Sequence, residues 1–333
     1  MHRVLLLSRN LSGSGDPDDP EPFPEAHTAG QAAVTVRASH LVEYAALRTA
    51  AAVVNLMPYR LALSFAHPVA LAAFNVCRFR TEEARRRIRS VFGDGFFSPE
   101  DVTAIARQSW LNVFYGAVEM MLAGRMSRRW IDAVLDGNEG LLRLKAHADT
   151  GRGAIIACPH MGNWELAAVA CHRYEIPIFT IAARQKNPFV DRYLNSLRRK
   201  PGIVTVARGA GTMKDVLRHL REGRFLAILP DVRMRSGGLP VPFLGGQAAI
   251  GKGMGLFARH AQVPVFPCLC LRTGRGRHRL EAGEPLWPDN SLGKEDDVRR
   301  LTETVLAGVE KAIRIDPGQW FWFNKRWVLD PIE

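Results

Sequence analysis

The segment from Cys158 to Leu166 has residue types and spacing suited to acid–base chemistry. His160 follows a short apolar run, and Glu165 falls in the first turn of a helix for which Asn163 is a good N-cap. On one continuous helix His160 and Glu165 would be about 140° apart, but a reversal of the chain between strand and helix brings them together. Glu165 would then accept from one imidazole nitrogen, so that the other removes a proton from an alcohol attacking a carbonyl group. The spacing alone also allows an alternative without catalysis, in which His160 has a capping role and Glu165 is an acidic residue of the kind common in the first turn of a helix.

The elements that must position this segment alternate between short β-prone runs and helical stretches. Such alternation predicts an α/β fold with a mixed, mostly parallel sheet flanked by helices. Because ligands bind outside the carboxyl ends of such strands, the loops after these runs are the ones expected to carry the site. We expect strands at Ala154–Cys158, Ile178–Ile181, Ile203–Val206, Phe225–Leu229 and Val263–Leu271, and helices at Asn163–His172, Asn187–Arg198, Gly211–Arg221 and Lys294–Ile313.

The chain before Gly151 has a different pattern. Residues 1–30 include a stretch rich in Pro, Gly, Asp and Glu and are predicted to be a disordered leader. Residues 31–150 are predicted to be a helical, membrane-associating region, and residues 151–333 the α/β catalytic region. Apolar residues recur at helical spacing from Ser98, which caps the predicted helix, to Ala123. Between Tyr44 and Val76, two apolar runs separated by Pro58 and Arg60 predict a pair of core or interfacial helices, with a single tilted span as the alternative.

Composition limits the classes of partner. The 333 residues carry a formal net charge of +12, which favours an anionic partner such as a membrane surface, an acidic carrier protein or a nucleic acid. The five cysteines form no CxxC pair, which fits a reducing compartment.

Three other kinds of site are disfavoured. The run Gly246–Lys252 resembles a phosphate-binding loop, but Gly253 stands where a Ser or Thr is needed, so we expect a tightly packed glycine-rich turn. Cys158 and His160 lack the spacing of zinc ligands, and no metal is expected. The basic stretch Arg272–Arg279 is expected to be a hairpin loop facing acidic headgroups, because no nucleic-acid-binding module accompanies it.

The segment His160–Glu165 resembles the H-x4-D/E box of the bacterial late acyltransferases of lipid A synthesis, the lauroyl and myristoyl transferases of the wider lysophospholipid acyltransferase class. Further blocks resemble this family in the same order along the chain. They are Arg184–Asp191, continuing to Arg198, Arg199 and Gly202; Leu229–Asp231; Val241–Gly245; Val263–Val265; and Gln319–Trp327. The likeness extends from about residue 41 to residue 327.

The resemblance implies an O-acyltransferase in which His160 is the catalytic base and Glu165 its charge partner. It also implies that Arg184, Arg198 and Asp231 line the site, the arginines meeting phosphate or carrier-protein groups.

We place Asn163 with these substrate-binding residues. The implied donor is an acyl thioester of acyl carrier protein or of CoA, with no cofactor. The implied acceptor is a hydroxyl of a membrane glycolipid such as a lipid A precursor, reached at the cytoplasmic face of the bacterial inner membrane. A lysophospholipid or other glycolipid acceptor stays open, as does a basic nucleic-acid- or lipid-binding protein without catalysis.

Overall fold

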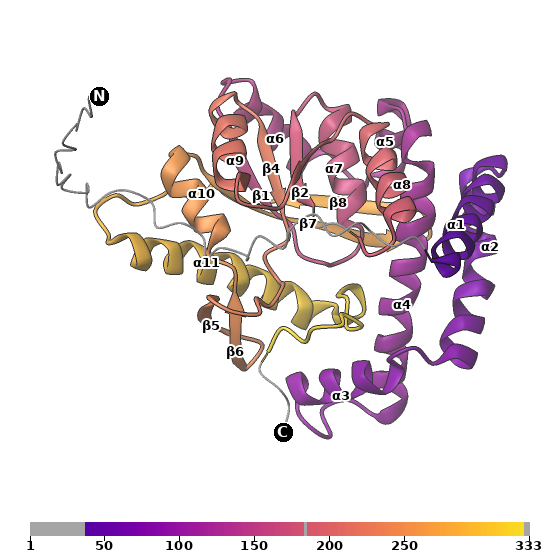
Figure 1. Ribbon diagram of the computed structural model, residues 1–333. Helices are drawn as coiled ribbons and strands as arrows, with labels where there is room; N and C mark the ends of the chain where they lie inside the picture. Colours follow the sequence, from indigo (N-terminus) through magenta and orange to yellow (C-terminus); the bar gives the residue numbers. More distant parts are fainter. Residues whose placement is uncertain (1–36, 183–184, 330–333) are drawn as a thin grey trace, which may run out of the picture. The chain divides into compact units, whose positions relative to one another are not determined.

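A computed structural model describes residues 37–182 and 185–329 of the chain, in which helices precede a sheet covered by further helices (Figure 1). The described residues all belong to one compact unit. The predicted leader, residues 1–30, lies outside the described residues. The boundary predicted at residue 150, between a helical and a catalytic region, stays a prediction.

The central sheet has the order β3-β2-β4-β1-β7-β8. The first five of these strands are parallel to their neighbours, and β8 is antiparallel to β7. The predicted α/β fold with a mixed, mostly parallel sheet is therefore confirmed. The strands are β1 (Ala154–Ala157), β2 (Ile178–Ala182), β3 (Val204–Ala207), β4 (Phe225–Ile228), β7 (Val265–Gly274) and β8 (Arg277–Ala282).

Alternate residues of β1 belong to different faces of the sheet. Ile155 and Ala157 pack in one hydrophobic core, whereas Ala154 and Ile156 pack in the other. Helices cover both faces, and this is why the parallel strands read as continuous apolar runs (Figure 1). The helices that follow β1 in the chain are α7 (Trp164–Arg173), α8 (Pro188–Arg199), α9 (Thr212–Arg221), α10 (Gly253–Ala261) and α11 (Lys294–Ile315).

The sequence analysis gave no bounds for strand β8, the second arm of the hairpin expected at Arg272–Arg279, and it missed a separate two-stranded hairpin of β5 (Leu239–Phe243) and β6 (Gly246–Ile250). The glycine-rich turn expected at Gly246–Lys252 is wrong, because most of that segment is strand β6. Residues of β6 alternate between more exposed and more buried positions. The sequence does not reveal this alternation, because Gly and Ala occupy both kinds of position and differ little in hydrophobicity.

The N-terminal region is helical, as predicted. Ser98 caps the long helix α4 by accepting from the backbone N–H of Asp101. Pro58 separates the first two helices, because its ring disfavours helical backbone at the residue before it. The helices are α1 (Ala38–Leu56), α2 (Tyr59–Ala72), which continues into a π-helical turn (Ala73–Cys77), α3 (Thr81–Phe92), α4 (Pro99–Leu122), α5 (Arg128–Val134) and α6 (Glu139–Ala148), with a 3-10 turn at Ala123–Arg125.

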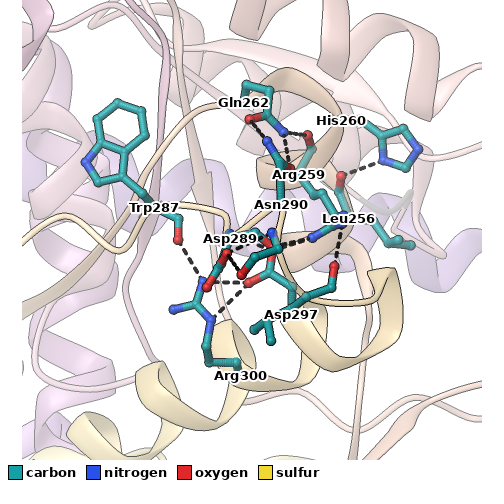
Figure 2. Close-up of polar contacts among 11 residues, drawn as sticks. Leu256, Arg259, His260, Gln262, Trp287, Asp289, Asn290, Asp297 and Arg300 are labelled. Carbon is teal, nitrogen blue, oxygen red and sulfur yellow. Dashed lines mark hydrogen bonds and ion pairs between the residues drawn. The ribbon is translucent and has the colours of Figure 1, made fainter.

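A buried carboxylate, Asp297 in the first turn of α11, fixes the loop before that helix (Figure 2). Its oxygens pair with Arg259 of α10 at 3.0 Å and with Arg300 at 2.5 Å, and one accepts from the backbone of Asp289. Since an unpaired buried charge is costly, these contacts couple α10 and α11 on one face of the sheet.

Candidate active site

The ends of two neighbouring strands bring His160 and Asp231 together. Strand β1 ends at Ala157 and β4 at Ile228, and these two residues are partners in the parallel ladder. His160 is the third residue after the end of β1, and Asp231 is the third residue after the end of β4. Both side chains therefore lie at the same level beyond the carboxyl edge of the sheet. Their proximity follows from the strand order, although 71 positions separate them in the chain.

His160 and Asp231 form a hydrogen-bonded pair. The imidazole Nδ1 of His160 lies 2.9 Å from Asp231 Oδ1, and the backbone N–H of His160 donates to Oδ2, also at 2.9 Å. The indole N–H of Trp320 donates to the same Oδ2 at 2.8 Å. The Asp231 side chain is 1% exposed and that of His160 17%, so the carboxylate is enclosed while the ring keeps access to solvent.

The electrostatics of the pair favour its charged form. Burial alone would lower the pKa of His160, but the charge and hydrogen bond of Asp231, with a contribution from Glu165, outweigh burial and raise it. Burial would raise the pKa of Asp231, yet the charge of His160 and the hydrogen bonds from His160 and Trp320 lower it. Asp231 is therefore an ionised acceptor that holds the proton of His160 on Nδ1 and leaves Nε2 as the basic nitrogen.

The expected hydrogen bond between Glu165 and His160 is not found in the described part of the chain. Glu165 instead pairs with Arg198 of α8, whose Nη2 lies 2.7 Å from Oε1 and whose Nε lies 3.4 Å from Oε2. The carboxylate partner of His160 is thus Asp231. The H-x4-E spacing could not show this, because it contains no information on which strand lies beside β1.

Asn163 and Arg198 already have partners within the protein. The Asn163 side-chain oxygen caps α7 by accepting from Leu166 N at 3.0 Å, and its amide group donates to Glu119 Oε2 at 2.5 Å. Its predicted role as an N-cap is confirmed, but both ends of its side chain are engaged within the fold. Arg184 lies outside the described residues.

A buried cluster around Glu119 of α4 lies next to this loop. Arg272 makes a two-point ion pair with Glu119 at 3.0 and 2.6 Å, and His278 Nε2 lies 3.1 Å from Oε1. The Tyr59 hydroxyl donates to the same oxygen at 2.7 Å. Burial would raise the pKa of Glu119, but Arg272 and His278 lower it. The cluster joins α2, α4 and the β7–β8 hairpin to Asn163 at the start of α7.

This cluster corrects the expectation for Arg272–Arg279. Residues 272–274 and 277–279 belong to strands, and the side chains of Arg272 and His278 are buried against Glu119. Arg277 forms an ion pair with Asp136. The segment is therefore largely a hairpin whose basic side chains pair with carboxylates of the same chain. The expected loop facing acidic headgroups is not what its basic residues form.

A small pocket opens beside His160. It is lined by His160, Asp231, Trp320, Phe321, Asn324, Arg326, Trp327 and Val328. The C-terminal segment forms most of this wall, and the backbone N–H of Phe321 donates to the His160 carbonyl oxygen at 2.9 Å. A second, mostly apolar pocket lies between α4, α7 and α8, and the Glu165–Arg198 pair contributes to its lining.

The protein-family model described as "Bacterial lipid A biosynthesis acyltransferase" matches residues 34–328. The chain belongs to this family. The resemblance seen in the sequence motifs is thereby confirmed.

Curated relatives of this acyltransferase-family protein include enzymes for two kinds of glycolipid. A phosphatidylinositol mannoside acyltransferase of Mycolicibacterium smegmatis is 27% identical over 187 residues, which cover 55% of this chain and 59% of the relative. Its counterpart in Mycobacterium tuberculosis is 25% identical, covering 62% and 63%. A lipid A biosynthesis acyltransferase of Haemophilus influenzae is 25% identical, covering 55% and 56%. The matched region thus spans about 60% of the length of these relatives.

Sequence analysis of this acyltransferase-family member missed three parts of the site: the role of Asp231 as partner of His160, the Trp320 hydrogen bond, and the Glu119 cluster. Glu119 is the one charged residue in the second half of α4, residues 111–122, and was a usable signal for the cluster. Its partners come from four separate segments and carry no common motif.

Proposed function

We propose that this protein is an O-acyltransferase that moves a fatty acyl group from a thioester to a hydroxyl group of a membrane glycolipid. The observation that carries the proposal is the His160–Asp231 pair, which gives a solvent-accessible imidazole an ionised, enclosed partner. Membership of the acyltransferase family supports the reaction type. The names of the curated relatives support a glycolipid acceptor.

In the proposed reaction, Nε2 of His160 removes the proton of the acceptor hydroxyl as its oxygen attacks the thioester carbonyl carbon. The carbonyl π electrons move to oxygen and form a tetrahedral oxyanion. The positive end of α7, which begins four residues after His160, favours this negative charge. Collapse of the intermediate breaks the C–S bond, and the thiolate recovers the proton from His160. The products are an ester and a free thiol, so no cofactor is consumed.

We propose that the donor is an acyl carrier protein or CoA thioester. The pocket between α4, α7 and α8 is small, but its lining includes Met120, Met126, Val169 and Leu197, apolar side chains suited to contact an acyl chain. Asp231 acts through His160 and does not contact the substrate in this scheme.

The place of reaction is proposed to be the cytoplasmic face of the bacterial inner membrane. Residues Tyr59–Cys77 form a helix long and apolar enough to cross a membrane by length and composition, and 28% of its apolar 18-residue window is buried in the protein. Leu61, Phe65 and Val69 are exposed on this helix. Its other side is held to α4, where the Tyr115 hydroxyl lies 2.6 Å from His67 Nδ1. These contacts favour a helix lying in the membrane surface, with its apolar side toward lipid.

Transfer of labelled acyl groups tests the proposal. Acyl carrier protein and CoA thioesters would be the donors, and total bacterial membrane lipids the acceptors. Wild-type protein would be compared with His160→Ala and with a control, His260→Ala. His260 of α10 contacts the Leu256 carbonyl oxygen, on a helix that contributes no residue to the pocket beside His160. A new acylated lipid, identified by mass and made by wild type and the control but not by His160→Ala, is expected. Wild-type turnover by a folded His160→Ala protein contradicts the mechanism.

A further inference from the structure

Positive charge accumulates where α3 meets the C-terminal segment, beside the His160 pocket. Arg87 of α3 is buried, and its Nη1 donates to the carbonyl oxygens of Trp322 at 2.7 Å and Asn324 at 2.8 Å. Its guanidinium lies over the Trp327 ring, 4.8 Å from the centroid. Among the described residues no carboxylate forms an ion pair with Arg87. Burial, followed by the neighbouring charge of Arg80, lowers the pKa of Arg87 to about 10.

Two donors near this junction lack acceptors in the described part of the chain. Arg80 Nη2 contacts the carbonyl oxygen of Lys325 at 3.4 Å, but its Nε is buried without a partner. The indole N–H of Trp327 is also buried without one, and Trp327 lines the pocket that holds His160. Arg80 adopts a left-handed backbone conformation, with φ of 55°. Such strain in a non-glycine residue recurs at functional sites.

Arg326 is the cationic side chain of that pocket. It lines the pocket together with His160, and its guanidinium forms no ion pair or hydrogen bond with the other described residues. Arg198, expected from the sequence to meet a phosphate group, is instead paired with Glu165. The pocket beside the proposed base therefore contains the guanidinium of Arg326, which has no described partner, and the indole N–H of Trp327, which has no acceptor. Arg80 and Arg87 add positive charge nearby.

We propose that this junction is a phosphate-binding subsite in which Arg326 is the principal ligand, aided by the Trp327 indole N–H and the charge of Arg80. A guanidinium fits a phosphate with two parallel hydrogen bonds, and an anion would offset the accumulated charge. The subsite deepens the proposed function, on which it rests, by assigning residues of this chain to the recognition of a phosphate group carried by one of the two substrates.

Two sources share this chemistry. The phosphate belongs either to the phosphopantetheine arm of a thioester donor or to the headgroup of the acceptor lipid. Direct binding tests the subsite without requiring turnover. Phosphopantetheine, pantetheine without the phosphate, and vesicles with or without a phosphorylated glycolipid would be titrated against the full chain, with tryptophan fluorescence as the readout. Arg326→Gln, Arg326→Lys and a matched control, Lys325→Gln, would be compared with wild type.

We expect a phosphate-bearing probe to bind wild type and Lys325→Gln equally. Arg326→Gln should weaken it about 10- to 100-fold, and Arg326→Lys should restore part of the affinity. The melting temperature should not change, because the Arg326 side chain is exposed. If Arg326→Gln weakens the binding of phosphopantetheine, the phosphate belongs to the donor. If Arg326→Gln weakens binding to the vesicles with phosphorylated glycolipid, the phosphate belongs to the acceptor. Equal binding of probes with and without phosphate, or no effect of Arg326→Gln on either, overturns the subsite.

Kinetics separate this inference from the proposed function. In an active enzyme, Arg326→Gln should raise the KM of the phosphate-bearing substrate about 10- to 100-fold and leave the KM of the other unchanged. Acyl transfer with both KM values unchanged refutes the subsite and keeps the function. Arg326-dependent phosphate binding by wild type that makes no acylated product keeps the subsite and refutes the function.

Discussion

Replacing Asp231 by Asn tests which carboxylate activates His160. Asparagine has nearly the same shape, and its amide oxygen can still accept from the His160 backbone and from Trp320. The amide NH2 group must then face His160 Nδ1, which can no longer donate to it. The ring proton therefore moves to Nε2, the nitrogen that has to act as the base.

The expected cost follows from the role of the base. A positioned general base contributes about 10²- to 10⁴-fold to the rate, so we expect kcat to fall by that factor, or by about 3 to 5 kcal/mol in the barrier. The pH profile should shift as well. Only neutral His160 is active, so wild-type activity falls as the pH drops through the raised pKa of His160. Without the Asp231 charge, burial prevails, and the acidic limb should move to lower pH.

Glu165→Gln is the matched comparison, since it also converts a carboxylate into its amide. Glu165 raises the pKa of His160 less than Asp231 does and forms no described hydrogen bond with the ring. We therefore expect a smaller fall in kcat and a smaller acidic shift. Steady-state rates between pH 5 and pH 9 would be measured for both folded variants. A larger loss and shift in Glu165→Gln than in Asp231→Asn would refute the assignment of Asp231 as the partner.

Three further predictions concern the buried Glu119 cluster, the backbone next to His160 and the membrane contact of α2. Glu119→Gln leaves the buried Arg272 without a counter-charge, and urea unfolding should show a loss of about 3 to 5 kcal/mol; an unchanged midpoint contradicts the ion pair. Gly162→Ala should lower kcat at least about tenfold with a lower melting temperature, because φ is 59° and the added Cβ would lie 2.0 Å from the Cys270 carbonyl oxygen. Phe65→Glu, on the exposed side of α2, should reduce sedimentation with anionic vesicles without changing the melting temperature; undiminished binding excludes this face from membrane contact.

Local sequence was sufficient for much of the fold and for one member of the His160–Asp231 pair. Apolar runs of strand length alternating with helical stretches predicted β1 to β4 and β7, because parallel strands buried on both faces retain that pattern. Ser98 and Asn163 predicted the start of their helices, since an N-cap depends only on the next few residues. His160 was identified because it lies just after a predicted strand and opens the H-x4-E segment that resembles a known family.

The tertiary structure decided which groups His160 contacts. Glu165 is five residues away but turns toward Arg198, whereas Asp231 reaches the ring because β4 lies next to β1 in the sheet. Strand order is set by the packing of the whole chain, and no short segment contains it. The same reason applies to Arg272, which reads as an exposed basic residue in the sequence and is buried against Glu119 in the fold. The sequence by itself determined most of the helices, the parallel strands and the proposed base, because these depend on local pattern; long-range packing determined the partner of that base and the walls of its pocket.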